Sequence, residues 1–157
     1  ECIAILTTPL LTRFLDLVRG RDEAWCLALD RRLEELGAGR MPEIWGVRLN
    51  AADAPAAHRA LMDDAAVELS DLLRDNTDRD QRMAIMPLLL DKGGELLVTP
   101  DGSMRLAAGD QLLFAGAIGT RRRLDLTLQN ANVLDYVLTG HERASGWLWQ
   151  KFTRTAV

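Results

Sequence analysis

An acidic loop at residues 75–82 is the first place in the sequence where side chains could do chemistry. Asp75, Asp78 and Asp80 stand close together there, and carboxylates at such spacing can hold a hard cation such as calcium, which prefers several oxygen ligands. The calcium-loop pattern is absent, because its central Gly and terminal Glu are missing. Interleaved arginines would also neutralise the carboxylates. We interpret the loop as solvated, and a small metal-dependent enzyme is the alternative that these aspartates leave open.

A basic turn that follows a predicted strand is a second candidate. Gly119 and Thr120 stand where that strand passes into a predicted helix, and free backbone N–H groups at such a junction attract anions. Arg121 and Arg122 add positive charge, although cations at a helix start are unfavourable for the helix itself. The turn is therefore a candidate anion site, and the simpler interpretation is an exposed basic turn paired with nearby carboxylates.

The nucleophilic side chains form no recognisable catalytic group. His58 and His141 are the only histidines and stand far apart, and no serine lies in a nucleophile elbow. Cys26 falls on the apolar face of a predicted helix, where it acts as a small buried hydrophobe. The sequence therefore predicts a non-enzyme, with no catalytic residue.

Composition narrows the class of protein further. The net charge of −4 over 157 residues, with a pI near 5.2, argues against nucleic-acid binding, which needs a basic face. No run reaches the roughly 18 apolar residues that would cross a membrane. The two cysteines form no disulfide framework, so we expect a reducing, cytoplasmic compartment.

A helical hairpin is predicted over residues 8–36. Thr8 can cap the first helix and Pro9 suits its first turn. Gly20 ends that helix, and Asp22 caps a second one that carries an apolar face opposite a charged one. Such apolar faces need something to cover them, and the family resemblance described below implies that a second copy of the chain covers them. The predicted dimer contacts are Leu11, Phe14, Leu15, Val18, Trp25 and Leu29.

The rest of the chain alternates between predicted strands and helices. Strands are predicted at 43–49, 67–69, 83–90, 95–99 and 111–116. Helices are predicted from Pro55, after an N-cap at Ser70, and from Thr120; a last one at 132–138, slightly favoured over a strand, would end at Gly140. Trp147, Trp149 and Phe152 suggest that the tail forms an edge strand or a docked segment.

The turns between the last three strands carry the most specific pattern. Lys92-Gly93-Gly94 and Pro100-Asp101-Gly102 are tight-turn sequences. Gly109-Asp110 then precedes the apolar run that ends at Gly116. This order resembles the C-terminal lobe of the regulator-of-potassium-conductance module, also called the TrkA-C domain, in which a strand follows the pattern L-x-x-G-D-x-L. The resemblance is best over residues 43–128.

The resemblance implies an α+β fold: an N-terminal helical hairpin followed by a lobe with a mixed or antiparallel sheet of about four to five strands and flanking helices. It divides the chain into the end of an upstream domain plus the dimerisation hairpin at 1–40, the regulatory lobe at 43–128 and a C-terminal extension at 129–157. The chain would be an excised piece of a larger protein. It lacks a Gly-x-Gly-x-x-Gly motif, so the family's nucleotide site is not carried over.

By the same resemblance, the protein is a cytoplasmic regulatory domain of a bacterial potassium channel or transporter. It would be non-catalytic, would pair with a second copy, in a homodimer or a larger gating ring, and would act on a membrane pore. A nucleotide or divalent cation would belong to the full-length protein, with no cofactor in this fragment. A further alternative, less favoured because the chain is acidic, is a DNA-binding module with 8–36 as helix-turn-helix and 83–99 as its wing.

Overall fold

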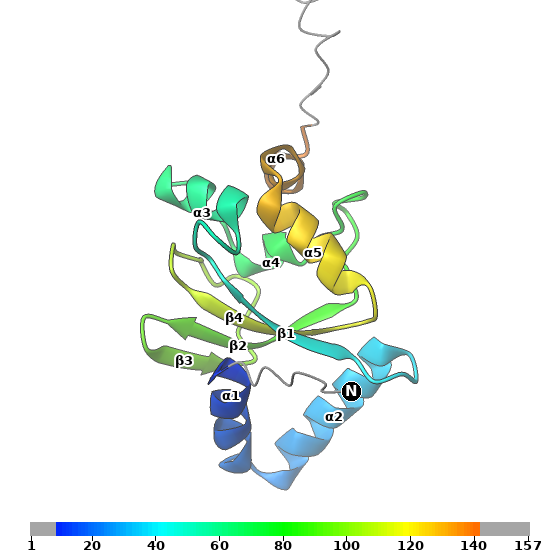
Figure 1. Ribbon diagram of the computed structural model, residues 1–157. Helices are drawn as coiled ribbons and strands as arrows, with labels where there is room; N and C mark the ends of the chain where they lie inside the picture. Colours follow the sequence, from blue (N-terminus) through cyan, green and yellow to red (C-terminus); the bar gives the residue numbers. More distant parts are fainter. Residues whose placement is uncertain (1–8, 142–157) are drawn as a thin grey trace, which may run out of the picture.

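The computed structural model describes residues 9–141, which form three layers: a four-stranded sheet with helices on each of its faces (Figure 1). One layer is the hairpin of α1 (Pro9–Arg19) and α2 (Glu23–Gly37). The opposite layer contains α3 (Pro55–Met62), α4 (Leu69–Leu72), α5 (Thr120–Gln129) and α6 (Ala131–Thr139). The α+β class predicted from the sequence is confirmed. No helix within 9–141 has the length and apolar character needed to cross a membrane.

The sheet is antiparallel throughout, with the strand order β1-β4-β2-β3. Its strands are β1 (Glu43–Arg48), β2 (Ile85–Lys92), β3 (Glu95–Val98) and β4 (Gln111–Gly116). The β2–β3 turn contains Gly93 at φ 63° and Gly94 at φ 101°. Two successive positive φ angles favour glycine and match the twist of a tight hairpin. The tight turn predicted at Lys92-Gly93-Gly94 is therefore present, with its two glycines in the conformation that requires them.

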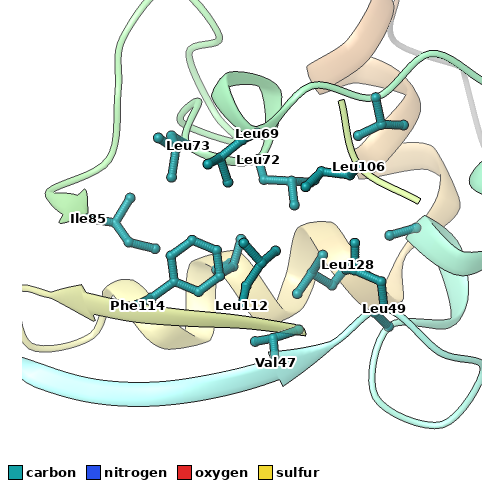
Figure 2. Close-up of a cluster of buried hydrophobic side chains, with 14 of the residues drawn as sticks. Val47, Leu49, Leu69, Leu72, Leu73, Ile85, Leu106, Leu112, Phe114 and Leu128 are labelled. Carbon is teal, nitrogen blue, oxygen red and sulfur yellow. The ribbon is translucent and has the colours of Figure 1, made fainter. Parts of the chain in front are cut away.

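The larger core lies between the sheet and the layer of α3 to α6 (Figure 2). Leu112 and Phe114 of β4 enter it from the sheet, and Leu72 of α4 and Leu128 of α5 enter it from above; each is at most 1% exposed. Full burial of one such side chain stabilises the fold by about 1.5–3 kcal/mol. This core therefore holds the sheet against the layer of α3 to α6.

A smaller core attaches the hairpin to the other face of the sheet. Leu10, Phe14 and Leu29 of the hairpin pack with Leu89 and Leu113 of the sheet. The second helix begins as predicted, because the Asp22 carboxylate accepts a hydrogen bond from the Trp25 backbone N–H at 2.7 Å. The hairpin thus lies against the sheet of its own chain.

A register shift in β2 decides which side chains reach the hairpin. The pairing with β4 shifts between Pro87 and Leu89, and proline has no N–H to donate to a ladder. The extra residue interrupts the alternation of faces. As a result, both Leu88 and Leu89 are fully buried in the hairpin core, whereas strict alternation would send one of them to the opposite face.

Three local predictions need correction. The second strand begins at Ile85 rather than Met83. Residues 67–69 form no strand; Glu68 makes only an isolated bridge, and α4 already begins at Leu69. Ser70 is therefore not the N-cap, and the Glu68 backbone N–H instead donates to Asp71 Oδ2 at 3.0 Å. The helix predicted at 132–138 is confirmed as α6, and Gly140 caps it at φ 77°.

Candidate functional site

A cleft of about 570 Å³ lies between α2 and one end of the sheet. Arg32, Glu35 and Leu36 of α2 form one wall. The other wall comes from the end of α4, the start of β2 with the residues just before it, and the turn after β3. It contains Leu73, Arg82, Ile85, Met86, Pro87, Thr99, Pro100, Asp101 and Gly102. The two walls therefore belong to different layers of the molecule.

The rim of the cleft is held by strained and constrained backbone. Thr99 adopts φ 45°, a left-handed conformation that is unfavourable for a β-branched residue. Its N–H nevertheless donates to Leu88 O at 2.8 Å, which ties the turn to the shifted part of β2. On the other side of the turn, the Ser70 N–H donates to Gly102 O at 2.8 Å. These bonds fix the turn between the sheet and α4, and strain of this kind is typical of functional sites.

The charged groups of the cleft are both basic and acidic. Arg32 and Arg82 are exposed, and no ion pair links either of them to a carboxylate within residues 9–141. The Asp101 carboxylate accepts hydrogen bonds from the Ser103 hydroxyl and from the Ser103 backbone N–H. These two bonds, the hydroxyl's first, lower the pKa of that carboxyl below its usual value. Two arginines without carboxylate partners can bind an anionic group, and the carboxylates of Glu35 and Asp101 can accept hydrogen bonds from the same ligand.

The acidic loop does not bring its three aspartates together as a metal site. Arg123 of α5 donates to Asp75 Oδ1 at 2.6 Å, while Asp78 accepts hydrogen bonds from the Asp80 backbone and from Gln81. In the described part of the chain, no group of three or more His, Cys, Asp or Glu side chains could hold a metal ion. Asp75 instead joins the loop to α5.

The predicted anion site lines a pocket of about 560 Å³ at the start of α5. Gly119 precedes the helix at φ 89°. The Thr120 N–H already donates to Ala117 O at 3.0 Å, and Arg121 Nε lies 4.0 Å from Asp125 Oδ2. Glu43 and Asp125 line the pocket beside Arg121 and Arg122. One of its two arginines therefore already has a carboxylate partner, whereas within residues 9–141 neither arginine of the cleft has one.

The residues predicted to contact a second copy divide into two groups. Phe14 and Leu29 are 5% and 8% exposed and pack against the chain's own sheet. Leu11, Val18 and Trp25 pack at the margin of the same core and are half-buried. The guanidinium of Arg21 also lies 5.3 Å from the Trp25 ring centroid. Leu15, at 46% exposed, is the member of the set most open to a partner.

Two buried aspartates connect the turns that carried the family resemblance. Asp91 Oδ2 accepts a hydrogen bond from Arg13 of α1 at 2.7 Å, and Asp91 Oδ1 accepts one from the Gly94 N–H at 2.8 Å. Asp110 Oδ2 accepts one from Lys92 at 3.0 Å and one from the Ala107 N–H at 2.8 Å. The side chain of Asp110 therefore stabilises the Gly109-Asp110 turn, and Asp91 links α1 of the hairpin to the sheet.

Sequence reasoning missed Arg32, Arg82 and the contact between Arg13 and Asp91. Arg32 lies on the charged face of a helix and Arg82 at the end of a charged loop, and nothing in their local sequence distinguishes them from solvated arginines. Asp91 carried a readable signal, because it is a single acidic residue between an apolar strand and a glycine turn. The predictions for Trp147, Trp149 and Phe152 lie outside the described residues.

Comparison with known proteins adds no family assignment. A scan against protein-family models found no match to the chain, and a search of curated proteins found none either.

Proposed function

We propose that this chain is a non-catalytic regulatory domain of a potassium channel or transporter, which senses a ligand in the cytoplasm and acts on a membrane pore. The cleft between α2 and the sheet is the observation that carries the proposal. Because its walls belong to two layers, a ligand that contacts both walls favours one position of the hairpin over others. A ligand shifts such an equilibrium only by its difference in affinity for the two states.

The connection between hairpin and lobe supports this mechanism. The hairpin is attached by a small apolar cluster and by the contact between Arg13 and Asp91, and it leads directly to the residues that precede Pro9. A change in how α2 sits on the sheet therefore reaches the start of α1. The potassium function itself is inferred from the sequence resemblance of the Gly109-Asp110 turn and its neighbours, and Asp110 accepts hydrogen bonds from Lys92 and from the Ala107 N–H in that turn.

The cleft favours a ligand with an anionic group, for which Arg32 and Arg82 would be the contacts. Dimerisation remains part of the proposal, with the outer side of the hairpin around Leu15 as its contact surface, since Phe14 and Leu29 are used within the chain. Light scattering at micromolar concentration tests the dimer independently of the ligand.

Rubidium uptake in the source organism tests the potassium function. We compare cells whose gene carries Arg32→Ala with Arg82→Ala to cells that carry Arg31→Ala with Arg59→Ala, two exposed arginines outside the cleft. The cleft variant should change the rate of uptake and its response to external potassium, whereas the control should behave as wild type. Wild-type uptake in the cleft variant, with normal protein levels, would contradict the proposal.

A further inference from the structure

A second concave surface lies beside the C-terminal half of α2. This groove of about 820 Å³ runs between the C-terminal half of α2, the turn after it and the start of β1. Leu33, Ala38, Met41, Pro42 and Ile44 line it. Met41 is 89% exposed and Ile44 is 45% exposed, so the groove presents apolar side chains to solvent.

The rim of the groove is acidic. Asp30, Glu34 and Glu35 stand along its α2 side, against a single arginine, Arg40, on the turn. Within residues 9–141 none of these three carboxylates belongs to an ion pair. The groove therefore suits an occupant that carries large apolar side chains together with positive charge.

The chain itself contains such a segment after its last described residue. Residues 147–154 read Trp-Leu-Trp-Gln-Lys-Phe-Thr-Arg, with three aromatic side chains, two cations and no acidic residue. Aromatic side chains bury about 150–250 Å² each and dominate the energetics of such contacts. Lys151 and Arg154 flank Phe152 in the sequence, so the segment brings positive charge on both sides of an aromatic ring.

The segment is also long compared with the domain. From His141, the 11 residues to Phe152 extend over roughly 36–40 Å when fully stretched, at about 3.3–3.6 Å per residue. A compact domain of this size has a radius of gyration of about 14 Å. The stretched tail is therefore about as long as the domain is wide, which brings much of the domain's surface, though not its far pole, within reach of Phe152.

We propose that residues 147–154 dock into this groove of the same chain, with Phe152 and the tryptophans against Met41 and Ile44, and with Lys151 and Arg154 against Asp30 and Glu34. The groove then belongs to the fold of the whole chain. Docking there would hold the outer side of α2, the helix whose inner side forms a wall of the cleft.

Disulfide formation in the full chain tests this arrangement. In a background with Cys2→Ser and Cys26→Ser, the pair Met41→Cys and Phe152→Cys is compared with the pair Met62→Cys and Phe152→Cys. Met62 is 63% exposed and ends α3, a helix that packs against α6. The control position therefore lies nearer to the start of the tail, and an undocked tail would react there at least as fast. Docking should instead make the Met41 pair form an intrachain disulfide about tenfold faster, because it raises the effective concentration at that site.

A charge variant separates docking from chance contact. Adding Asp30→Lys and Glu34→Lys to the Met41 pair should remove most of its rate advantage, whereas Asp63→Lys, a change on an exposed carboxylate outside the groove, should not. Circular dichroism checks that each variant keeps its thermal midpoint. Equal rates at Met41 and Met62, or a product that is mainly a cross-linked dimer, would overturn the proposal.

Discussion

The two faces of the sheet are covered in different ways. The face toward α3 to α6 buries more than twice as many residues as the face toward the hairpin. On the first face every strand except β3 contributes fully or nearly fully buried side chains, whereas on the second face only Leu10, Phe14 and Leu29 of the hairpin's apolar side chains are buried. The helical layer of α3 to α6 therefore forms the main core with the sheet, and the hairpin is a docked layer whose local stability is expected to be lower.

Adjacent leucines in β4 give the most direct test of this difference. Leu112 faces the helical layer and Leu113 faces the hairpin, and both are fully buried. Leu112→Ala should destabilise the fold by about 2–5 kcal/mol, because the surrounding core cannot collapse onto the cavity. Leu113→Ala should fall at the lower end of that range, since the hairpin can settle into the space. Urea unfolding measures both, and a larger loss for Leu113→Ala would reverse the assignment of core and docked layer.

The contact between Arg13 and Asp91 should control how firmly the hairpin is held. Asp91 is buried, with its side chain 5% exposed, while the Arg13 side chain is 52% exposed. Arg13→Gln weakens a charge-assisted hydrogen bond to a buried carboxyl, and we expect a loss of about 1–2 kcal/mol. Amide exchange in α1 and α2 should accelerate by about 5–30-fold, with little change in α5.

Arg19→Gln provides the matched control, because Arg19 pairs with Asp16 at the surface of the same helix. It should change stability by less than about 0.5 kcal/mol. If Arg13→Gln accelerated exchange equally in the hairpin and in α5, the two layers would unfold together and the docked-layer description would be wrong.

The acidic loop on the helical side should contribute a pH-dependent part of the stability. Burial alone would raise the pKa of Asp75, but hydrogen bonds from Thr77 and the charge of Arg123 outweigh it and lower that pKa below 3.8. Since the folded state holds the proton less tightly than the unfolded chain, this contribution is complete above pH 3.8 and is lost as the pH falls through the folded pKa.

Acid unfolding of Asp75→Asn measures that contribution. The difference in stability from wild type should be largest at neutral pH and should shrink as the pH falls below about 4. Asp80→Asn, a change on an exposed carboxylate of the same loop, should show no such trend. A constant difference across the acid range would mean that the Asp75 charge does not stabilise the fold.

The smallest effect is expected within the larger core itself. Trp45 is 3% exposed and stacks at a tilt on Phe114, yet its indole N–H is buried without a hydrogen-bond partner. Trp45→Phe removes that unsatisfied donor, which offsets the packing lost with the smaller ring. We expect a net change below about 1 kcal/mol in urea unfolding, and a loss above about 3 kcal/mol would show that the packing term dominates.

Local chemistry made much of the fold predictable from the sequence. The Asp22 cap, the Gly93-Gly94 turn and the Gly140 helix end each depend on one or two residues and their own backbone. Apolar periodicity indicated β4 with its observed bounds. These features follow from the sequence because their energies are set within a few residues.

Contacts between distant residues decided the parts that the sequence left open or indicated wrongly. The Leu69 N–H donates to Met104 O and the Met83 N–H to Leu73 O, both at 2.9 Å, so long-range bonds set the start of α4 and engage Met83 outside the sheet. The cleft arises in the same way, because Arg32 and Arg82 line one cleft only when α2 packs on the sheet. The amino-acid sequence by itself determined most of the elements and the glycine turns. Tertiary structure alone decided what covers each face of the sheet, because that choice depends on apolar area and ion pairs between residues far apart in the chain, such as Arg13 and Asp91.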